Sequence, residues 1–320
     1  RGRAVVLDLV DRADVFVTNL RVDALERAGF DHESLRARNH RLVYASVTGL
    51  GLEGDERGRA AYDVGSFWSR AGVAMALTPE GGANLPYQRG GMADHMTGMA
   101  AAGAVSAALF NRERTGEGQL ISTSLLRIGA YMLGWDVSIN LRTGMPTVPL
   151  TRTTSPNPLI IDYGTKDGKR FWMLGLEGDR HWPNVLRAVE RPDLLDDPRF
   201  AGLFDRAANN AELVALLDEI FATRTRDEWG SIFDREGVWW APVQATHEMI
   251  DDPQAVAAGC FVPVADVDGR RAVATPVDFA RQHPAARPVP EMGQHTEEVL
   301  LELGYDWDVI IELKELGAVY

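Results

Sequence analysis

Short apolar stretches with strand character alternate with helical stretches through the N-terminal part of the chain, and this alternation restricts the possible folds more than any other feature. Residues 15–17 and 42–47 have the apolar composition of buried strands, and a helix over residues 22–28 follows the first of them. Asp31 can cap a second helix. Strands joined by helices form a parallel sheet, so we expect an α/β fold with a Rossmann-like large domain. The remaining predicted elements are helices over residues 4–10, 63–75 and 94–112 and a strand over residues 119–123.

Polar residues follow two of the predicted strands. Asn19 comes directly after the first strand region, and Thr48 ends the second. Ligands of open α/β sheets bind outside the carboxyl ends of the strands. The sequence therefore predicts a ligand site at this edge of the sheet.

A single carboxylate stands where a flexible loop becomes the longest predicted helix. Gly90 and Gly91 precede Asp94, and residues without a side chain let a bulky ligand approach the backbone. The free N–H groups of a first helical turn can hydrogen-bond a developing negative charge. An Asp in this position is most often a helix cap. A site for acyl chemistry on Asp94 is the alternative.

The charge balance excludes two classes of partner. The chain has 46 acidic and 33 basic residues and a formal net charge of -13, whereas nucleic acids and anionic membranes require clustered positive charge. No apolar run approaches the roughly 20 residues of a membrane span, and no signal peptide is visible. Cys260 is the single cysteine, which excludes an internal disulfide and a cysteine-based metal cluster. We expect a soluble, cytoplasmic protein.

Two proline-marked segments bracket the middle of the chain and are predicted to be linkers. The middle section begins with a hairpin-like stretch from Asp162 to Lys169, which is typical of a smaller α+β domain. The predicted boundaries are a large domain over 1–150, a linker over 151–160, a small domain over 161–282, a linker over 283–295, and helices over 296–320 that return to the large domain.

A second motif lies at the end of the helix that starts near Asp94. Residues 112–119 are Arg-Glu-Arg-Thr-Gly-Glu-Gly-Gln. An Asp before a Gly- and Ala-rich helix that closes on this motif resembles the family III CoA-transferases, the CaiB/BaiF family, which includes formyl-CoA transferase. Leu20 and His40 depart from the family patterns around them. Three further segments are similar to family patterns, namely residues 13–21 (ADVFVTNLR), 39–49 (NHRLVYASVTG) and 293–300 (GQHTEEVL).

The resemblance implies a reaction and an assembly. Asp94 would attack an acyl-CoA thioester, carry CoA as an aspartyl-CoA thioester, and pass CoA to a carboxylic acid. The helix N-terminus would favour the ionised carboxylate that this attack requires. CoA is a substrate in this scheme, and neither a metal nor a redox cofactor is expected. The resemblance also implies an interlocked homodimer and a further N-terminal region, before Arg1, that contributes to the CoA site.

The resemblance further implies where CoA binds. Guanidinium groups match the geometry of phosphates, although most charged side chains simply face water. A tyrosine and an aspartate match a family position that borders the thioester, although an isolated tyrosine is more often a packing residue. The residues assigned to CoA in this way are Asn19, Leu20, Arg21, Arg27, Tyr62 and Asp63.

Two other functions stay open on the sequence alone. The α-methylacyl-CoA racemases share the fold and resemble this chain at Asp94 and Glu177, but they place a histidine where this chain has Tyr62. Phenols stay protonated at neutral pH and are poor general bases, which favours CoA transfer. Glu177 is then a participant in the second half of the reaction or an ordinary surface carboxylate. The third possibility is an acyl-CoA-binding protein without activity.

Overall fold

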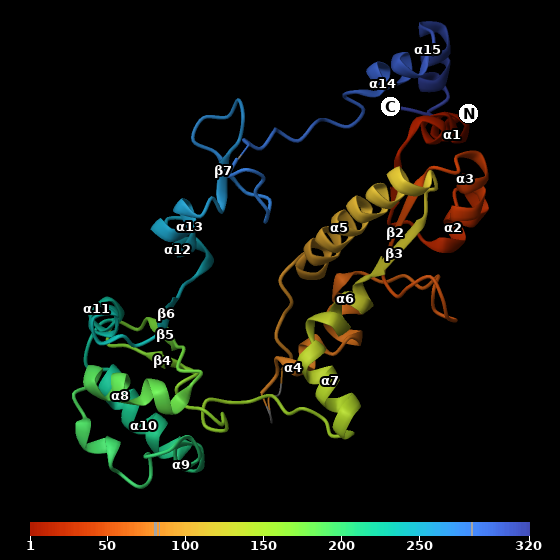
Figure 1. The fold of residues 1–320 in the computed structure, drawn as a ribbon. Helices are drawn as coiled ribbons and strands as arrows, with labels where there is room; N and C mark the ends of the chain where they lie inside the picture. Colours follow the sequence, from red (N-terminus) through yellow and green to blue (C-terminus); the bar gives the residue numbers. More distant parts are fainter. Residues whose placement is uncertain (80–81, 83, 283) are drawn as a thin grey trace. The chain divides into compact units, whose positions relative to one another are not determined.

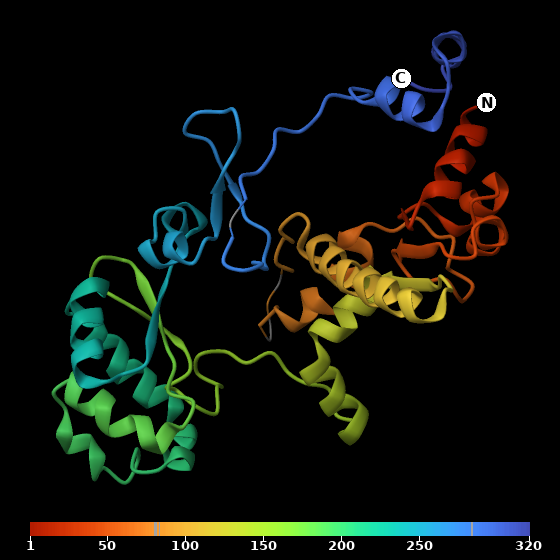
Figure 2. The same ribbon diagram turned by 45° about the horizontal axis from the view of Figure 1, so that its top comes forward.

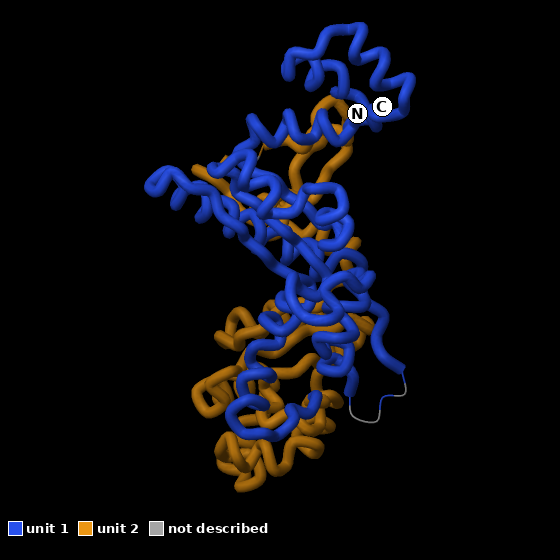
Figure 3. Tube along the Cα trace, turned by 90° about the vertical axis from the view of Figure 1, so that its right-hand side faces the viewer, with its two compact units in different colours: residues 1–149, 290–320 blue, residues 150–289 orange. Residues whose placement is uncertain are grey.

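The computed structural model describes residues 1–79, 82, 84–282 and 284–320. These residues form two compact units, and Figure 3 shows them in separate colours. Unit 1 contains residues 1–149 and 290–320, and unit 2 contains residues 150–289. The domain and linker boundaries inferred from the sequence stay predictions. His283, the first residue of the second predicted linker, lies outside the described residues.

Unit 1 combines helices with a parallel sheet (Figure 1). Its elements, in chain order, are α1 (Gly2–Arg12), β1 (Val15–Thr18), α2 (Val22–Ala28), α3 (His32–Arg38), β2 (Val43–Thr48), the π-helical η1 (Val64–Arg70), α4 (Val73–Ala76), α5 (Met92–Thr115), β3 (Leu120–Ser124), α6 (Leu125–Met132), α7 (Gly134–Thr143), α14 (Thr296–Leu303) and α15 (Trp307–Glu315).

The three strands of unit 1 pair in the order β1-β2-β3, and both pairings are parallel. Their register places Val17 opposite Ala45 and Ser46 opposite Ser122. The predicted α/β fold with a parallel sheet is therefore confirmed. Each strand begins within about one residue of its predicted start, because apolar and β-branched residues are confined to these short stretches.

Helices cover both faces of this sheet. Ala101 and Ala104 of α5 approach Val47 of β2, and their small side chains let the helix lie close to the strands. On the opposite face Leu35 of α3 packs with Tyr44 of β2 in a buried cluster. Figure 2 shows α5 running alongside the strands. Because α5 connects two parallel strands, it runs against their direction and starts on the side of their carboxyl ends.

The far end of α5 is tied to the start of two strands by a buried arginine. Arg112 is only 7% exposed, and its Nη1 donates to the backbone oxygens of Asp14 and Arg41 at 3.3 Å each. Its Nη2 lies 2.9 Å from the Asp14 carboxylate. Asp14 and Arg41 directly precede the β1 and β2 regions, so this end of α5 lies at the amino edge of the sheet. Asp94 lies about five turns away at the other end of the helix.

Gly118, in the turn between α5 and β3, has no room for a side chain. A Cβ atom there would come within 2.1 Å of the Leu42 carbonyl oxygen, which is a backbone atom that cannot move aside. We expect Gly118→Ala to lower the free energy of unfolding by about 2 kcal/mol, measured by urea denaturation. Gly103→Ala is the matched control, because Gly103 lies inside α5 with open space around it. That substitution should raise stability by about 0.5 kcal/mol, and an equal loss in both variants would contradict the expectation.

The prediction of a single helix over residues 63–75 is wrong. It is divided into η1 and α4, and Gly72 between them has a φ of 89°. A left-handed backbone interrupts helical hydrogen bonding, and only glycine adopts it without strain. The break lets Phe67 and Trp68 of η1 join a buried cluster with Ala93 of α5.

Unit 2 contains an antiparallel sheet, a helical layer and a separate hairpin (Figure 1). Its elements are β4 (Asp162–Gly164), β5 (Arg170–Met173), α8 (Gly178–Ala188), the 3-10 helix η2 (Pro192–Leu195), α9 (Leu203–Ala208), α10 (Asn210–Phe221), α11 (Arg226–Glu236), β6 (Trp240–Val243), α12 (Thr246–Met249), α13 (Pro253–Ala257), β7 (Phe261–Pro263) and β8 (Arg271–Val273).

Aromatic side chains form the centre of the unit 2 core. Phe171 of β5 makes edge-to-face contacts with Phe221 and Phe233, with ring centroids 5.0 and 4.9 Å apart. Tyr163 of β4 packs against the same Phe221 ring, also at 5.0 Å. Rings in this arrangement contribute packing energy beyond the area they bury. This core gives unit 2 its own hydrophobic centre.

The terminal helices α14 and α15 pack on α1 within unit 1. Leu300, Ile310 and Leu313 form a buried cluster with Val5 of α1. The Arg12 guanidinium donates to the backbone oxygens of Glu302 and Leu303 at 2.7 and 2.9 Å. These carbonyls belong to the last turn of α14, where helical acceptors lack backbone partners. The C-terminal residues are thus joined to the start of the chain.

Candidate active site

The first turn of α5 begins two residues earlier than predicted. Met92 is its first residue, and its N-cap is Gly91, with a left-handed φ of 75°. Asp94 is the third residue of the helix and makes no capping hydrogen bond. The interpretation of Asp94 as a helix cap is therefore wrong. A glycine precedes the helix in a conformation that a residue with a side chain would rarely adopt.

The cap of α5 comes instead from Asp63, which lies at the start of η1. Its Oδ2 accepts a hydrogen bond from the backbone N–H of Ala93 at 3.3 Å. Its Oδ1 accepts from Nε2 of Gln88 at 2.6 Å. Both carboxylate oxygens of Asp63 are thus engaged within the protein. Sequence reasoning did not identify Gln88, because no local pattern marks a loop glutamine as buried.

The Asp94 carboxylate is exposed and makes no hydrogen bond or ion pair with the described residues. The N–H groups of Met92 and Asp94 also have no acceptor among those residues. The His95 ring turns back toward Gly91, where its Cε1 would lie 3.1 Å from an added Cβ. An exposed carboxylate without a partner thus lies beside unpaired backbone donors in the first turn of α5.

Hydroxyl groups line the carboxyl ends of the strands. Thr18 Oγ1 accepts from the N–H of Leu20 at 3.2 Å, and Thr48 Oγ1 accepts from Gly51 at 2.9 Å. Ser124 Oγ accepts from the N–H of Arg127 at 3.1 Å. Each bond turns the chain directly after its strand, as side-chain oxygens commonly do at turns. The three buried hydroxyls shape the edge at which the ligand site was predicted.

The structure places five of the six residues assigned to CoA at exposed positions of unit 1, whereas Asp63 is half-buried and its carboxylate is engaged by Gln88 and Ala93. Asn19 and Leu20 are exposed directly after β1, and Arg21 is the N-cap residue of α2. Arg27 lies in the last turn of α2. Neither guanidinium has an ion-pair partner within the described part of the chain. Tyr62 is 84% exposed, and its backbone oxygen accepts from two N–H groups that start η1. The role of these residues in binding CoA stays a prediction.

Two arginines on either side of Tyr62 in the sequence line one cavity. Arg59 and Arg70 line a cavity of about 370 Å³ together with Ala61. Glu56 contacts both guanidinium groups. Hydrogen bonds from Arg70 and Arg59 lower the pKa of the Glu56 carboxyl. Glu56 thus lies between two guanidinium groups at this cavity.

The sequence model of CoA-transferase family III matches residues 1–296. The chain belongs to this family. It is 28% identical over 321 residues to (R)-2-hydroxy-4-methylpentanoate CoA-transferase of Clostridioides difficile, covering 99% of this chain and 80% of that protein. It is 29% identical to cinnamoyl-CoA:phenyllactate CoA-transferase of Clostridium sporogenes, covering 98% and 77%. The crystal structure of a CaiB/BaiF family protein from Brucella suis matches with a TM-score of 0.80 and 30% identity, covering 94% of this chain and 78% of that chain.

Membership of family III identifies the chemistry at a coarse level. The chain is an acyl-CoA:carboxylate CoA-transferase, and CoA is a substrate of this family rather than a bound cofactor. No group of three or more His, Cys, Asp or Glu side chains among the described residues is placed to hold a metal ion. In the same residues, no helix has the length and apolar character needed to cross a membrane.

Glu177 lies in unit 2 of this family III chain. It precedes α8, and its carboxylate pairs with Arg180 at 2.6 Å. Both side chains are more than half exposed, so the pair is screened by water and contributes little to stability. A catalytic role of Glu177 stays a prediction.

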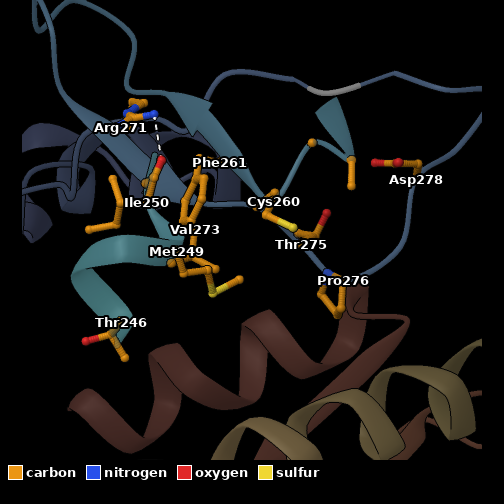
Figure 4. A pocket seen from close by; sticks show the side chains of 14 residues that line it. Thr246, Met249, Ile250, Cys260, Phe261, Arg271, Val273, Thr275, Pro276 and Asp278 are labelled. Carbon is orange, nitrogen blue, oxygen red and sulfur yellow. Dashed lines mark hydrogen bonds between the residues drawn. The ribbon is translucent and has the colours of Figure 1, made fainter. Parts of the chain in front are cut away.

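Unit 2 also contains an apolar cavity of about 630 Å³ beside the β7–β8 hairpin (Figure 4). Its wall includes Met249, Phe261 and Val273, and Cys260 lies in it as well. Arg271 Nη1 donates to the Ile250 carbonyl oxygen at 3.2 Å at one side. The cavity contains none of the residues assigned to the reaction, so its size does not make it the active site.

Proposed function

We propose that Asp94 is the nucleophile of this family III CoA-transferase. The observation that carries the proposal is an exposed, unpaired carboxylate in a first helical turn whose position is held by Asp63. Carboxylates are weak nucleophiles toward thioesters, and a fixed position beside the substrate compensates for this weakness. The unpaired N–H groups of Met92 and Asp94 are candidates to stabilise the oxyanion.

The proposed reaction has two symmetrical halves. Asp94 attacks the thioester carbonyl of the donor, the C–S bond breaks, and a mixed anhydride and CoA thiolate form. The thiolate attacks the Asp94 carbonyl, which releases the donor acid and leaves an aspartyl-CoA thioester. The acceptor carboxylate attacks this thioester and displaces the thiolate to give a second anhydride. The thiolate then attacks the acceptor carbonyl, which forms the new acyl-CoA and regenerates Asp94.

We further infer that CoA lies along the carboxyl ends of the strands. Arg21 supports this placement, because its exposed guanidinium group follows β1 directly, and Arg27 in the last turn of α2 offers a second exposed guanidinium group to a phosphate. The side chains of Asn19 and Leu20 are exposed directly after β1, and the side chain of Tyr62 is exposed just before η1. Replacing Arg21 by Met is expected to raise KM for acyl-CoA about tenfold with little change in kcat, because a phosphate contact is equal in ground and transition states. A kcat loss with unchanged KM would contradict this assignment.

We propose a 2-hydroxy acid with an apolar side chain as the acceptor class. Two of the relatives named above act on such acids according to their names, which specify 2-hydroxy-4-methylpentanoate and phenyllactate. The exposed rings of Tyr62 and Tyr87 flank Asp63 and Gln88 in sequence and offer apolar surface. Rates with a panel of 2-hydroxy acids and dicarboxylic acids distinguish this class from others.

A homodimer completes the proposal. α7 has no buried residue, and its Trp135 is 81% exposed. Tyr131 of α6 and Leu141 of α7 are also exposed. Apolar surface of this kind is typical of a protein interface, and a second copy of the chain is the proposed partner. Sedimentation equilibrium should give twice the mass of the chain.

The aspartyl-CoA intermediate can be tested directly. The protein is incubated with an acyl-CoA alone, digested, and analysed by mass spectrometry for CoA bound to the peptide that contains Asp94. We expect this adduct, and new acyl-CoA after an acceptor acid is added. Deuterium entering the α-carbon of the substrate without CoA exchange would indicate a racemase instead. Tight binding of acyl-CoA with neither signal would indicate a binding protein.

A further inference from the structure

We propose that Gln88 is a positioning residue for CoA transfer, because it orients the carboxylate that caps the helix of Asp94. This inference rests on the proposed role of Asp94. Gln88 is 8% exposed, and its Nε2 donates to Asp63 Oδ1 at 2.6 Å. The other oxygen of Asp63 accepts from the N–H of Ala93 at 3.3 Å. These two hydrogen bonds share one carboxylate, and together we call them the Asp63–Gln88 clamp.

Gln88 controls the clamp because the two oxygens of a carboxylate are rigidly connected. A bond that holds Oδ1 of Asp63 also sets the direction of Oδ2. The bond to Ala93 is long, at 3.3 Å, and is weak by itself. The bond from Gln88 is short and largely shielded from water, which strengthens it. Without the Gln88 amide, the Asp63 carboxylate is free to rotate away from the start of α5.

The clamp acts on a segment that has little stiffness of its own. Gly90 and Gly91 lie between Gln88 and Ala93, and glycine has access to more backbone conformations than other residues. The clamp holds residues on both sides of this pair. A further bond, from Trp68 Nε1 to the Pro86 carbonyl at 3.1 Å, holds the preceding loop to η1. The first turn of α5 is therefore located by contacts with η1.

Asp94 follows Ala93 directly, so the clamp determines where its carboxylate points. Attack on a thioester carbonyl requires reacting atoms about 3–3.5 Å apart and correctly aligned. A displacement of about 1 Å can reduce the rate about 100-fold. Gln88 does not touch the reacting atoms in this scheme. Its effect passes through Asp63 and the backbone of Ala93.

Unit 2 offers a matched control with the same chemistry. Gln244 Nε2 donates to Asp252 Oδ2 at 2.7 Å. Oδ1 of Asp252 accepts from the N–H groups of Gln254 and Ala255 and so caps α13. A glutamine again orients an aspartate that caps a helix, but α13 carries no residue assigned to the reaction.

The first test compares Gln88→Ala with Gln244→Ala in the complete protein. Gln88→Ala should lower kcat about 10- to 100-fold and change KM for acyl-CoA less than about threefold. Backbone amide exchange should become faster in the peptide that contains Ala93. Gln244→Ala should keep the parent kcat. Unchanged kcat in Gln88→Ala, or an equal loss in both variants, would overturn the inference.

The second test uses Gln88→Glu, which places a carboxylate against Asp63 without a large change in volume. At neutral pH the two carboxylates repel each other, whereas at low pH they can share a proton and restore the hydrogen bond. The activity of this variant relative to the parent should rise as the pH falls from about 8 to about 5. A constant ratio would show that Gln88 only fills space and would overturn the inference.

The outcome for Asp94 separates the two proposals. CoA transfer that survives Asp94→Ala would overturn the proposed function, and this inference with it, whatever the Gln88 variants do. Loss of transfer in Asp94→Ala together with full kcat in Gln88→Ala would overturn the positioning role alone.

Discussion

Asp94→Ala is expected to abolish CoA transfer and to leave the fold intact. Without the carboxylate no anhydride can form, so the rate of new acyl-CoA formation should fall about 10⁴-fold or more. The Asp94 side chain is exposed and makes no bond with the described residues. Stability should therefore change by only about 0.5 kcal/mol, from the loss of a negative charge near a helix N-terminus. Chromatographic measurement of acyl-CoA exchange and a thermal unfolding curve check the two expectations.

Asp308→Ala is the matched control for this prediction. Asp308 is exposed in the first turn of α15, as Asp94 is exposed in the first turn of α5, and it lies in the same unit. Both substitutions remove an acidic side chain from a first helical turn. Asp308→Ala should keep the parent rate. A rate for Asp94→Ala within tenfold of the parent, or a CoA adduct on another residue, would contradict the role given to Asp94.

The strands of unit 1 could be predicted because their determinants are local. Apolar β-branched residues next to polar turn residues specify each strand, whereas the register of the two parallel pairs is seen only in the structure. The start of α5 could not be predicted in the same way. Its cap is Asp63, which is distant in sequence, and the residue before the helix is a glycine with positive φ. A rule that inspects only neighbouring residues assigns the cap to Asp94.

Two polar side chains, Gln88 and Arg112, are buried in the structure, and no local sequence pattern predicted their burial. Gln88 is buried because Asp63 accepts its hydrogen bond, and that partner becomes visible only in the folded chain. Arg112 belongs to the motif that most resembles the family, yet charged residues are expected at the surface. Packing accounts for two residues of that motif. Arg112 reaches backbone oxygens before two strands, and Gly118 leaves space for the Leu42 carbonyl.

The two ends of α5 have separate roles. The Arg112 end joins the helix to the sheet, and the Asp63–Gln88 clamp sets the direction of its first turn. Changes at the first end should therefore affect mainly the free energy of unfolding. Changes at the clamp should affect mainly kcat. Stability and rate measured in the same variants can distinguish these roles.

Arg112→Met is expected to lower the free energy of unfolding by about 3 kcal/mol. The substitution removes charge-assisted hydrogen bonds to the Asp14 and Arg41 carbonyls and the ion pair with the Asp14 carboxylate. Methionine keeps much of the buried side-chain volume, so the loss reports on the polar contacts. Urea denaturation measures the change. Arg112→Lys should recover only part of it, since an ammonium group cannot span both carbonyls and the carboxylate as a guanidinium does.

Arg114→Met isolates the effect of burial at Arg112. Arg114 belongs to the same motif and to the last turn of α5, but it is exposed and stacks on the exposed ring of Phe110. Its replacement should lower the free energy of unfolding by about 0.5 kcal/mol.

In folded Arg112→Met at low temperature, kcat should stay within about threefold of the parent, because the clamp still positions Asp94. A large kcat loss without a loss of stability would mean that the two ends of α5 do not act separately.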